Sequence, residues 1–297
     1  MERTEAVTLI GFDSAWANNP RAPGAICALR SESDGNWSLT DPVLVSFSDA
    51  SRFIGDLRQA NGICVVAIDQ PTIVPNPTSL RPVDRVAASL ISWLGGGVQP
   101  ANRSKIGLFD DTAPIWRFKA ELGATEDPEL ARTAADGLHL VEVFPALALP
   151  TIGPEFFGRL LGPRYNPERR KTYTRTSWDR VLDAAAAFAR GLELACVTEW
   201  CESHRVVSTP RKADQDKLDA ILCVLIAFTW RMQPRQASIM IGDLTSGYMV
   251  APASMGVRSR LTDAAKRYGV PVDGAIPSER HGTVSARGCA PMAQAGA

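Results

Sequence analysis

This sequence has no net charge, few histidines and no long apolar run. Lys and Arg together number 32, as do Asp and Glu, so the formal net charge is zero. No global field therefore draws the protein toward nucleic acid or membrane, and any site for a polyanion must be local. Only three histidines occur in 297 residues. The longest apolar run, residues 220–230, is too short to span a bilayer, so no membrane partner is expected.

The six cysteines are widely spaced and include no CxxC pair. Cys196, Cys201 and His204 lie close in sequence, but their spacing fits no common zinc pattern. Free thiols in a reducing cytosol are the better interpretation. The N-terminal residues carry charges followed by a short apolar run, which is not typical of a signal peptide. We therefore expect a soluble cytoplasmic protein.

The order of the apolar segments predicts an α/β fold. Three β-rich segments come first, and the run 63–68 is apolar without alternation, as in a strand buried on both faces. Asp34-Gly35 suits a tight turn, and Ser48 or Asp49 suits the start of the first helix. The expected strands are 7–12, 25–29, 37–47, 63–68, 138–144 and a hairpin at 239–250, with helices at 49–60, 81–94, 178–190, 192–200 and 214–230. This order predicts a mixed β-sheet, three antiparallel strands then parallel strands, with helices on both faces.

A single domain with an insertion explains this pattern more simply than two domains. We assign residues 1–256 to that domain, with a weakly patterned insertion at about 95–137. Residues 257–297 form a C-terminal extension that is polar and rich in Gly and Ala from about 277, where we expect disorder.

Acidic residues end three of the expected strands: Asp13 in GFDSAW, Asp69 in AIDQP and Glu142 in VEVFP. Ligands of α/β sheets gather at strand ends, where the loops leave the core. Any one such acid can instead cap a helix or open a turn. Three in one chain, with further acids at the start of the longest apolar helix, favour a shared site.

Asp216 and Asp219 lie three residues apart on that helix, with their Cβ atoms about 5 to 6 Å apart on one face. The helix dipole alone explains Asp216 but not Asp219, which lies between apolar positions and is expected to be partly buried. A buried carboxylate without a cation is protonated or destabilising. Carboxylates without a nearby histidine favour Mg²⁺ or Mn²⁺ and suit two-metal phosphoryl chemistry, with the ions roughly 4 Å apart.

The succession GFDSAW, AIDQP, VEVFP and KADQDKLDAILC resembles the DUF429 family, regarded as predicted nucleases of ribonuclease H-like fold. The resemblance runs from about Val7 to Ala251 and is most specific in the AIDQP and DKLDA segments. It implies a ribonuclease H-like sheet, with Asp13, Asp69, Glu142 and Asp219 as catalytic residues that bind metal together with Asp216. Arg81 and Asp84, downstream of AIDQP, are implied as auxiliary site residues.

Two positions depart from the pattern of that family. Ala146 stands where a Glu often follows the strand-end proline, and Gln215 stands where the first acid of an Asp-Asp pair is usual. These departures leave open whether one metal ion or two are bound.

Residues 163–175, PRYNPERRKTYTR, form a strongly basic segment with interleaved tyrosines. Arginine near aromatic rings suits phosphate contact and base stacking, so we assign nucleic-acid contacts to Arg169, Arg170, Lys171 and Arg175. The plain alternative is a solvated charged surface. Lys212, two residues before Asp214, is better placed to contact a scissile phosphate.

These observations favour a metal-dependent nuclease that hydrolyses phosphodiesters of DNA or RNA. One alternative is an inactive protein of the same fold that binds nucleic acid or has a structural role. A nucleotide phosphotransferase is the third, because such enzymes share the fold, but it requires glycine-rich phosphate loops. Residues 95–97, GGG, are the one candidate, and their context is wrong for such a loop.

Overall fold

The computed structural model describes residues 6–32, 35–58 and 62–277, and its central feature is a mixed five-stranded sheet. The order across the sheet is β3-β2-β1-β4-β5. β2 pairs antiparallel with both β1 and β3, whereas β1, β4 and β5 run parallel. The α/β class and the succession of antiparallel then parallel strands are confirmed. The strands are β1 (Ala6–Asp13), β2 (Gly24–Ser31), β3 (Trp37–Val45), β4 (Gly62–Ile68) and β5 (Gly137–Glu142).

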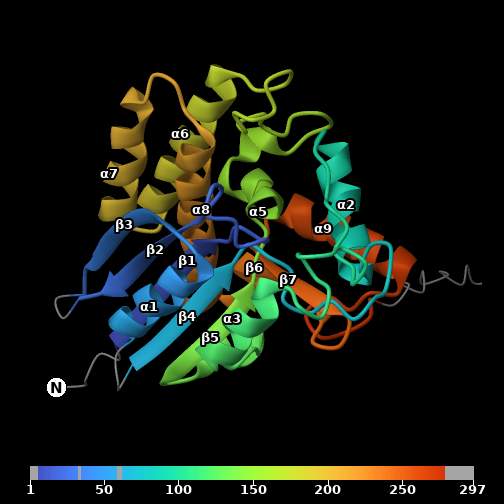
Figure 1. Cartoon of the computed structure of the whole chain (residues 1–297). Helices are drawn as coiled ribbons and strands as arrows, with labels where there is room; N and C mark the ends of the chain where they lie inside the picture. Colours follow the sequence, from blue (N-terminus) through green and yellow to red (C-terminus); the bar gives the residue numbers. More distant parts are fainter. Residues whose placement is uncertain (1–5, 33–34, 59–61, 278–297) are drawn as a thin grey trace, which may run out of the picture.

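Helices cover both faces of this sheet (Figure 1). One face packs against α8 (Lys212–Met232), backed by α6 (Arg175–Gly191) and α7 (Ala195–Ser203). The other packs against α1 (Phe47–Leu57) and α3 (Pro114–Leu122). Strand residues alternate between the two cores because their side chains point to opposite faces. On β4, Ala67 contributes to the α8 side and Ile68 to the α1 side.

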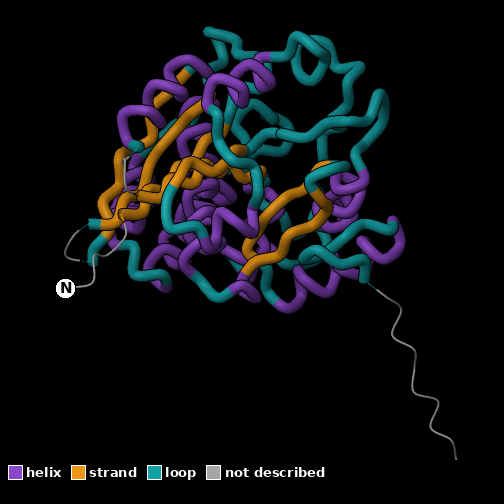
Figure 2. Tube along the Cα trace, turned by 90° about the horizontal axis from the view of Figure 1, so that it is seen from below, coloured by secondary structure: helices purple, strands orange, loops and turns teal. Residues whose placement is uncertain are grey.

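A second group of elements lies beside the sheet. The hairpin of β6 (Ser238–Asp243) and β7 (Gly247–Pro252) shares one apolar core with α2 (Pro82–Trp93) and α9 (Met255–Tyr268). Figure 2 shows the hairpin and the five-stranded sheet as two separate groups of strands. A parallel bridge between Val143 and Val250 joins the hairpin to the chain just after β5. The short helices α4 (Pro128–Thr133) and α5 (Pro145–Ile152) flank that strand.

The first helix begins earlier than expected. Ser46, rather than Ser48 or Asp49, caps α1, because its hydroxyl accepts from the Asp49 amide while the Asp49 carboxylate accepts from the Ser46 amide. The predicted turn at Asp34-Gly35 includes a residue outside the described ranges.

The segments outside the predicted domain core also form helices. Residues 95–136 add no strand to the sheet, but α3 buries Ile115 and Phe118 against it, and residue 137 already belongs to β5. Residues from 257 belong to α9, and Leu261 packs into the hairpin core. The disorder expected from about 277 concerns residues that, from 278 on, lie outside the described ranges.

Five cysteines fall in the described ranges, and all five are free thiols, as expected. Cys27, Cys64, Cys201 and Cys223 are buried and Cys196 is partly exposed, while Cys289 lies outside those ranges. Among the described helices, none combines the length and apolar character needed to cross a membrane.

Candidate acidic site

Two of the predicted acids lie side by side at the carboxyl edge of the parallel strands. Asp13 ends β1 and Asp69 directly follows β4, and the register pairs the residues before them, Phe12 and Ile68. Paired positions of neighbouring strands point to the same face. Side chains alternate along a strand and Ala67 packs on the α8 side, so Asp69, two residues later, and its neighbour Asp13 also face α8.

The close approach of α8 to β1 at Gly11 brings further acids to the same place. A Cβ atom on Gly11 would lie 2.6 Å from the backbone nitrogen of Val224, and still closer to the carbonyl oxygen of Ala220. Only glycine permits this contact. Asp216 and Asp219 lie within the turn of α8 that precedes it, which places them next to Asp13.

Three of the four aspartates of this cluster are buried, Asp69 is partly exposed, and their charges interact. Asp13, Asp216 and Asp219 are only 8%, 6% and 5% exposed. Burial raises the pKa of Asp13 well above its usual value, and the charges of Asp219 and Asp69 raise it further. Burial and Asp219 likewise raise the pKa of Asp69. The pKa of Asp219 is raised by burial to about 6. The fold thus concentrates more negative charge here than its own groups neutralise.

Lys212 is the cation of this cluster. Its ammonium contacts the carboxylate of Asp216, and its charge lowers the pKa of Asp13 and Asp69. Burial lowers the pKa of Lys212, but the attraction of Asp13 and Asp216 outweighs it and leaves that pKa raised. The structure therefore places Lys212 among the acids, one turn from Asp216, rather than at their periphery.

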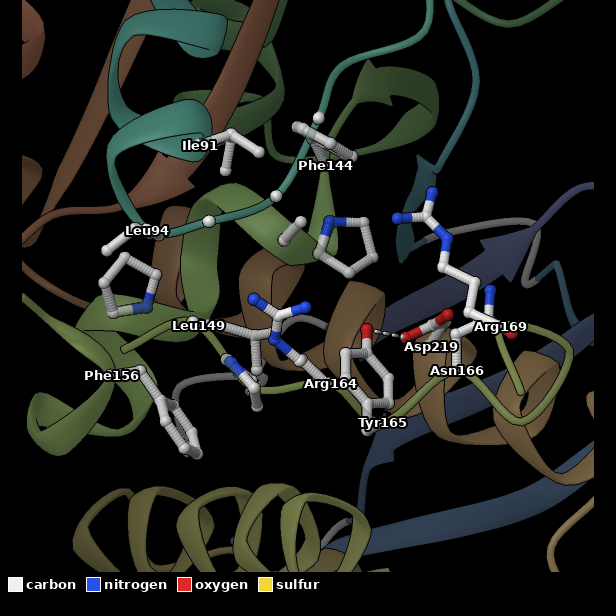
Figure 3. Close-up of a pocket in the computed structure, with 18 of the residues that line it drawn as sticks. Ile91, Leu94, Phe144, Leu149, Phe156, Arg164, Tyr165, Asn166, Arg169 and Asp219 are labelled. Carbon is white, nitrogen blue, oxygen red and sulfur yellow. Dashed lines mark hydrogen bonds between the residues drawn. The ribbon is translucent and has the colours of Figure 1, made fainter. Parts of the chain in front are cut away.

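Two hydrogen bonds orient Asp219. The Tyr165 hydroxyl donates to one carboxylate oxygen at 2.7 Å, and the Gln215 side-chain amide donates to the other at 2.7 Å (Figure 3). The remaining Gln215 oxygen, Oε1, is buried without a partner. Sequence reasoning did not assign Tyr165 to the site, because it lies in a loop 54 residues from Asp219 and no local pattern links them.

Glu142 lies on the other face of the sheet, but its charge still raises the pKa of Asp69, and its assignment as a metal ligand stays a prediction. It pairs with Ile68, one residue before Asp69, so its side chain points to the opposite face of the sheet. Arg81 contacts both of its carboxylate oxygens, at 2.6 and 3.0 Å. The Thr72 amide donates to it at 2.8 Å. Burial still raises the pKa of Glu142, against the effect of Arg81.

Arg81 and Asp84, predicted as auxiliary site residues, form a buried ionic network with Glu142. Arg81 is fully buried, and its guanidinium also contacts Asp84 at 2.8 Å and the carbonyl oxygen of Ile73 at 3.0 Å. The network ties the start of α2 to the end of β5 and to the loop after β4. It therefore supports the strand ends that carry the aspartates.

A cavity of about 540 Å³ opens beside the aspartates. Its lining includes the acids Asp69 and Asp219 as well as Arg164 and Arg169. A smaller cavity of about 180 Å³ shares Asp69 and Arg169 with it and reaches Glu142. Asp69 and Asp219 thus face an open space next to cationic side chains.

The basic segment divides into two parts. Arg169, Arg170 and Lys171 are exposed, and within the described ranges none of them forms an ion pair. Arg175 instead donates to the carbonyl oxygens of Val207, Ser208 and Arg205 and contacts Asp179. Its guanidinium makes these contacts while its side chain stays 38% exposed, and the assignment of Arg175 to nucleic acid stays a prediction.

No three His, Cys, Asp or Glu side chains of the described chain are placed to hold a metal ion as they stand. The contacts above give the reason. Both oxygens of Asp219 accept hydrogen bonds, and Asp216 contacts Lys212. A cation would have to exchange with these partners.

The fold and the site define an α/β protein with buried aspartates at the carboxyl edge of a mixed five-stranded sheet. Residues 11–241 match the family described as "Protein of unknown function (DUF429)", and the chain belongs to this family. No curated protein and no solved structure matches the chain. The matched region includes all the aspartates of the cluster, Lys212 and both ends of the Arg81 network.

Proposed function

We propose that this protein is a metal-dependent nuclease whose acidic cluster, Asp13, Asp69, Asp216 and Asp219, faces the scissile phosphodiester. The observation that carries the proposal is a charge imbalance beside a cavity. Four carboxylates share one ammonium group, Lys212. Two of them, Asp69 and Asp219, line a cavity that has Arg164 and Arg169 on its wall.

The donor chemistry of this cluster fits Mg²⁺ or Mn²⁺. Its ligand atoms are carboxylate oxygens, supplemented by the unpartnered Gln215 Oε1, and hard divalent cations prefer such oxygens. When bound there, the ion would neutralise the buried charge and supply Lewis acidity for phosphodiester hydrolysis. Lys212, which contacts Asp216, would compete with such an ion for that carboxylate, and its ammonium is a candidate for contact with the substrate phosphate.

In the proposed reaction, water attacks the phosphorus, the bond to one ester oxygen breaks, and the leaving oxygen takes a proton. Arg164 and Arg169 bind the phosphate oxygens. Tyr165 and Gln215 hold Asp219 in one orientation through their hydrogen bonds. Glu142 acts through Arg81 as a positioning residue for the loop that follows β4.

The topology supports a ribonuclease H-like identity, which we include in the proposal. Three antiparallel strands followed by two parallel strands, with helices on both faces, match the arrangement that the family resemblance implies. The acids at the ends of β1 and β4 and on α8 support this part of the proposal.

An inactive protein of the same fold is the alternative, favoured by one observation. Lys212 already contacts one of the acids, as an internal counterion would. The nucleotide phosphotransferase finds no such support. The amides of Gly95 and Gly96 donate to helix carbonyls and are not free to bind phosphate.

Incubation with single-stranded, duplex, hybrid and branched nucleic acids, with Mn²⁺ or Mg²⁺ and with EDTA, tests the proposal. Wild type and Asp56→Asn, an exposed residue of α1, should cleave at least one substrate when metal is present. Asp13→Asn should lose at least 100-fold in rate, the order expected when an electrostatic catalytic group is removed. Cleavage that persists in Asp13→Asn, or no metal-dependent cleavage by wild type, would refute the nuclease.

A further inference from the structure

The 540 Å³ cavity has two chemically different ends (Figure 3). Asp219 and Arg169 lie at one end. Leu94 and Phe156 lie at the other, and Arg164 and Tyr165 lie between them. A ligand that fills the cavity must therefore be anionic or metal-bridged at one end and apolar at the other.

The two arginines of the wall have no anionic partner. Neither Arg164 nor Arg169 forms an ion pair within the described ranges. Arg164 lies along the loop 95–97, since a Cβ on Gly95 would be 3.7 Å from its terminal nitrogen. Unpaired guanidinium groups beside a cavity suit phosphate, which they bind through paired hydrogen bonds.

The backbone at the apolar end offers little to a phosphate. The amides of Gly95 and Gly96 donate to carbonyl oxygens at the end of α2. The amides of Leu160 and Gly162 donate to the carbonyl oxygens of Trp93 and Leu94, which holds the loop with Arg164 and Tyr165 against α2. The three glycines of residues 95–97 thus provide a wall without side chains. Such a wall leaves room for a flat ring.

We infer that this cavity binds one unpaired nucleotide, with its base at the apolar end and its phosphate at Arg164 and Arg169. The volume lies within the roughly 300 to 1,000 Å³ of small-ligand sites. The buried oxygen of Gln215 adds a hydrogen-bond acceptor to the wall. The inference rests on the proposed function in one respect: if the protein is a nuclease, the phosphodiester of the bound nucleotide lies beside Asp69 and Asp219.

The inference defines the substrate class. A base stacked inside a duplex cannot enter the cavity, so the nucleotide must come from a single-stranded end or loop, from a flipped position, or from solution. Apolar contacts with a base tolerate every base, so specificity for one base is not expected.

Calorimetric titration of the full chain in Mg²⁺ tests the inference, with AMP, CMP, adenosine, inorganic phosphate and a 5′-phosphorylated single strand as probes. Both nucleotides should bind at least tenfold more tightly than adenosine or phosphate. Competition by the single strand, but not by a blunt duplex, assigns the nucleotide to a strand. Binding of AMP and CMP without such competition assigns it to a free nucleotide.

Three variants locate the binding. Gly97→Phe adds a ring to a residue of the cavity wall at which a Cβ meets nothing within 4 Å, and should abolish nucleotide binding. Arg164→Ala should weaken it roughly 10- to 100-fold. Arg159→Ala, an exposed arginine outside the cavity wall, should leave the affinity unchanged.

The outcomes separate this inference from the proposed nuclease. Nucleotide binding that Gly97→Phe and Arg164→Ala remove supports the inference even when no substrate is cleaved. Absence of nucleotide binding, or equal affinities in Arg159→Ala and Arg164→Ala, overturns it. Metal-dependent cleavage unaffected by Gly97→Phe overturns it as well, while leaving the nuclease intact.

Discussion

At the scale of single residues, Gly11 decides how close α8 comes to the sheet. The backbone of Ala220 and Val224 occupies the space that a side chain at residue 11 would need. Since Asp13 lies two residues beyond and Asp219 adjoins Ala220, the distance between these acids depends on that contact.

Gly11→Ala should therefore destabilise the protein by about 1 to 3 kcal/mol, because the methyl group meets backbone atoms that cannot rotate away. Urea denaturation measures the change. Gly55→Ala in α1, where a Cβ meets nothing within 4 Å, is the control and should be neutral or slightly stabilising. Equal stability of Gly11→Ala and wild type would contradict the close approach.

The raised pKa of Asp219 should make the stability of the protein depend on pH in the absence of divalent metal. That pKa rises from 3.8 to about 6 in the folded protein, so between these values the folded state binds more protons than the unfolded state. The free energy of unfolding from this group is therefore fully present below about pH 4 and falls as the pH rises to about 6.

The measurement is thermal unfolding of wild type and Asp219→Asn from about pH 4 to pH 7 in EDTA. Wild type should lose stability relative to the variant as the pH rises, because the variant lacks the carboxylate of residue 219 while both proteins keep Asp13 and Asp69. A difference between the two proteins that stays constant across this range would show that Asp219 titrates normally.

At the scale of secondary structure, the sequence revealed the strands and helices better than their contacts. The apolar run 63–68 and the three- and four-residue repeat of 214–230 identified β4 and α8, because burial on all sides leaves few polar positions. Glu142 shows the limit. A strand-end acid is visible in sequence, but its face depends on the register of β5 against β4, which no local pattern gives.

The same limit applies to the loop that carries Arg164 and Tyr165. Its composition indicated contact with phosphates, but the cavity that it borders depends on hydrogen bonds to the end of α2, about 70 residues earlier in the chain. Arg175 belongs to the same basic run, yet it binds carbonyl oxygens of the segment before α8.

Arg175 and Arg170 should therefore respond differently to substitution. Arg175→Ala removes four contacts at the start of α6 and should lower the free energy of unfolding by about 1 to 3 kcal/mol. Arg170→Ala changes an exposed side chain and should leave stability unchanged within about 0.5 kcal/mol. Denaturant unfolding of both variants is the check, and the reverse ranking would refute the structural role of Arg175.

At the scale of the whole molecule, the site lies where two bodies of structure meet. The sheet with α8 supplies the aspartates, and the group of α2, α5 and the hairpin supplies the cavity wall and the Arg81 network. The buried negative charge destabilises the folded protein, and a divalent cation bound there would neutralise part of that charge. Metal binding should accordingly stabilise the fold as well as permit catalysis.

Thermal unfolding during a titration with Mn²⁺ or Mg²⁺ tests that claim most directly. The melting temperature of wild type and of Asp56→Asn should rise with metal. At a metal concentration a hundredfold above Kd, the free energy of unfolding should increase by about 2.7 kcal/mol. Asp13→Asn should lose most of this rise. A wild-type melting temperature that does not respond to metal, or an equal rise in Asp13→Asn, would contradict the metal site.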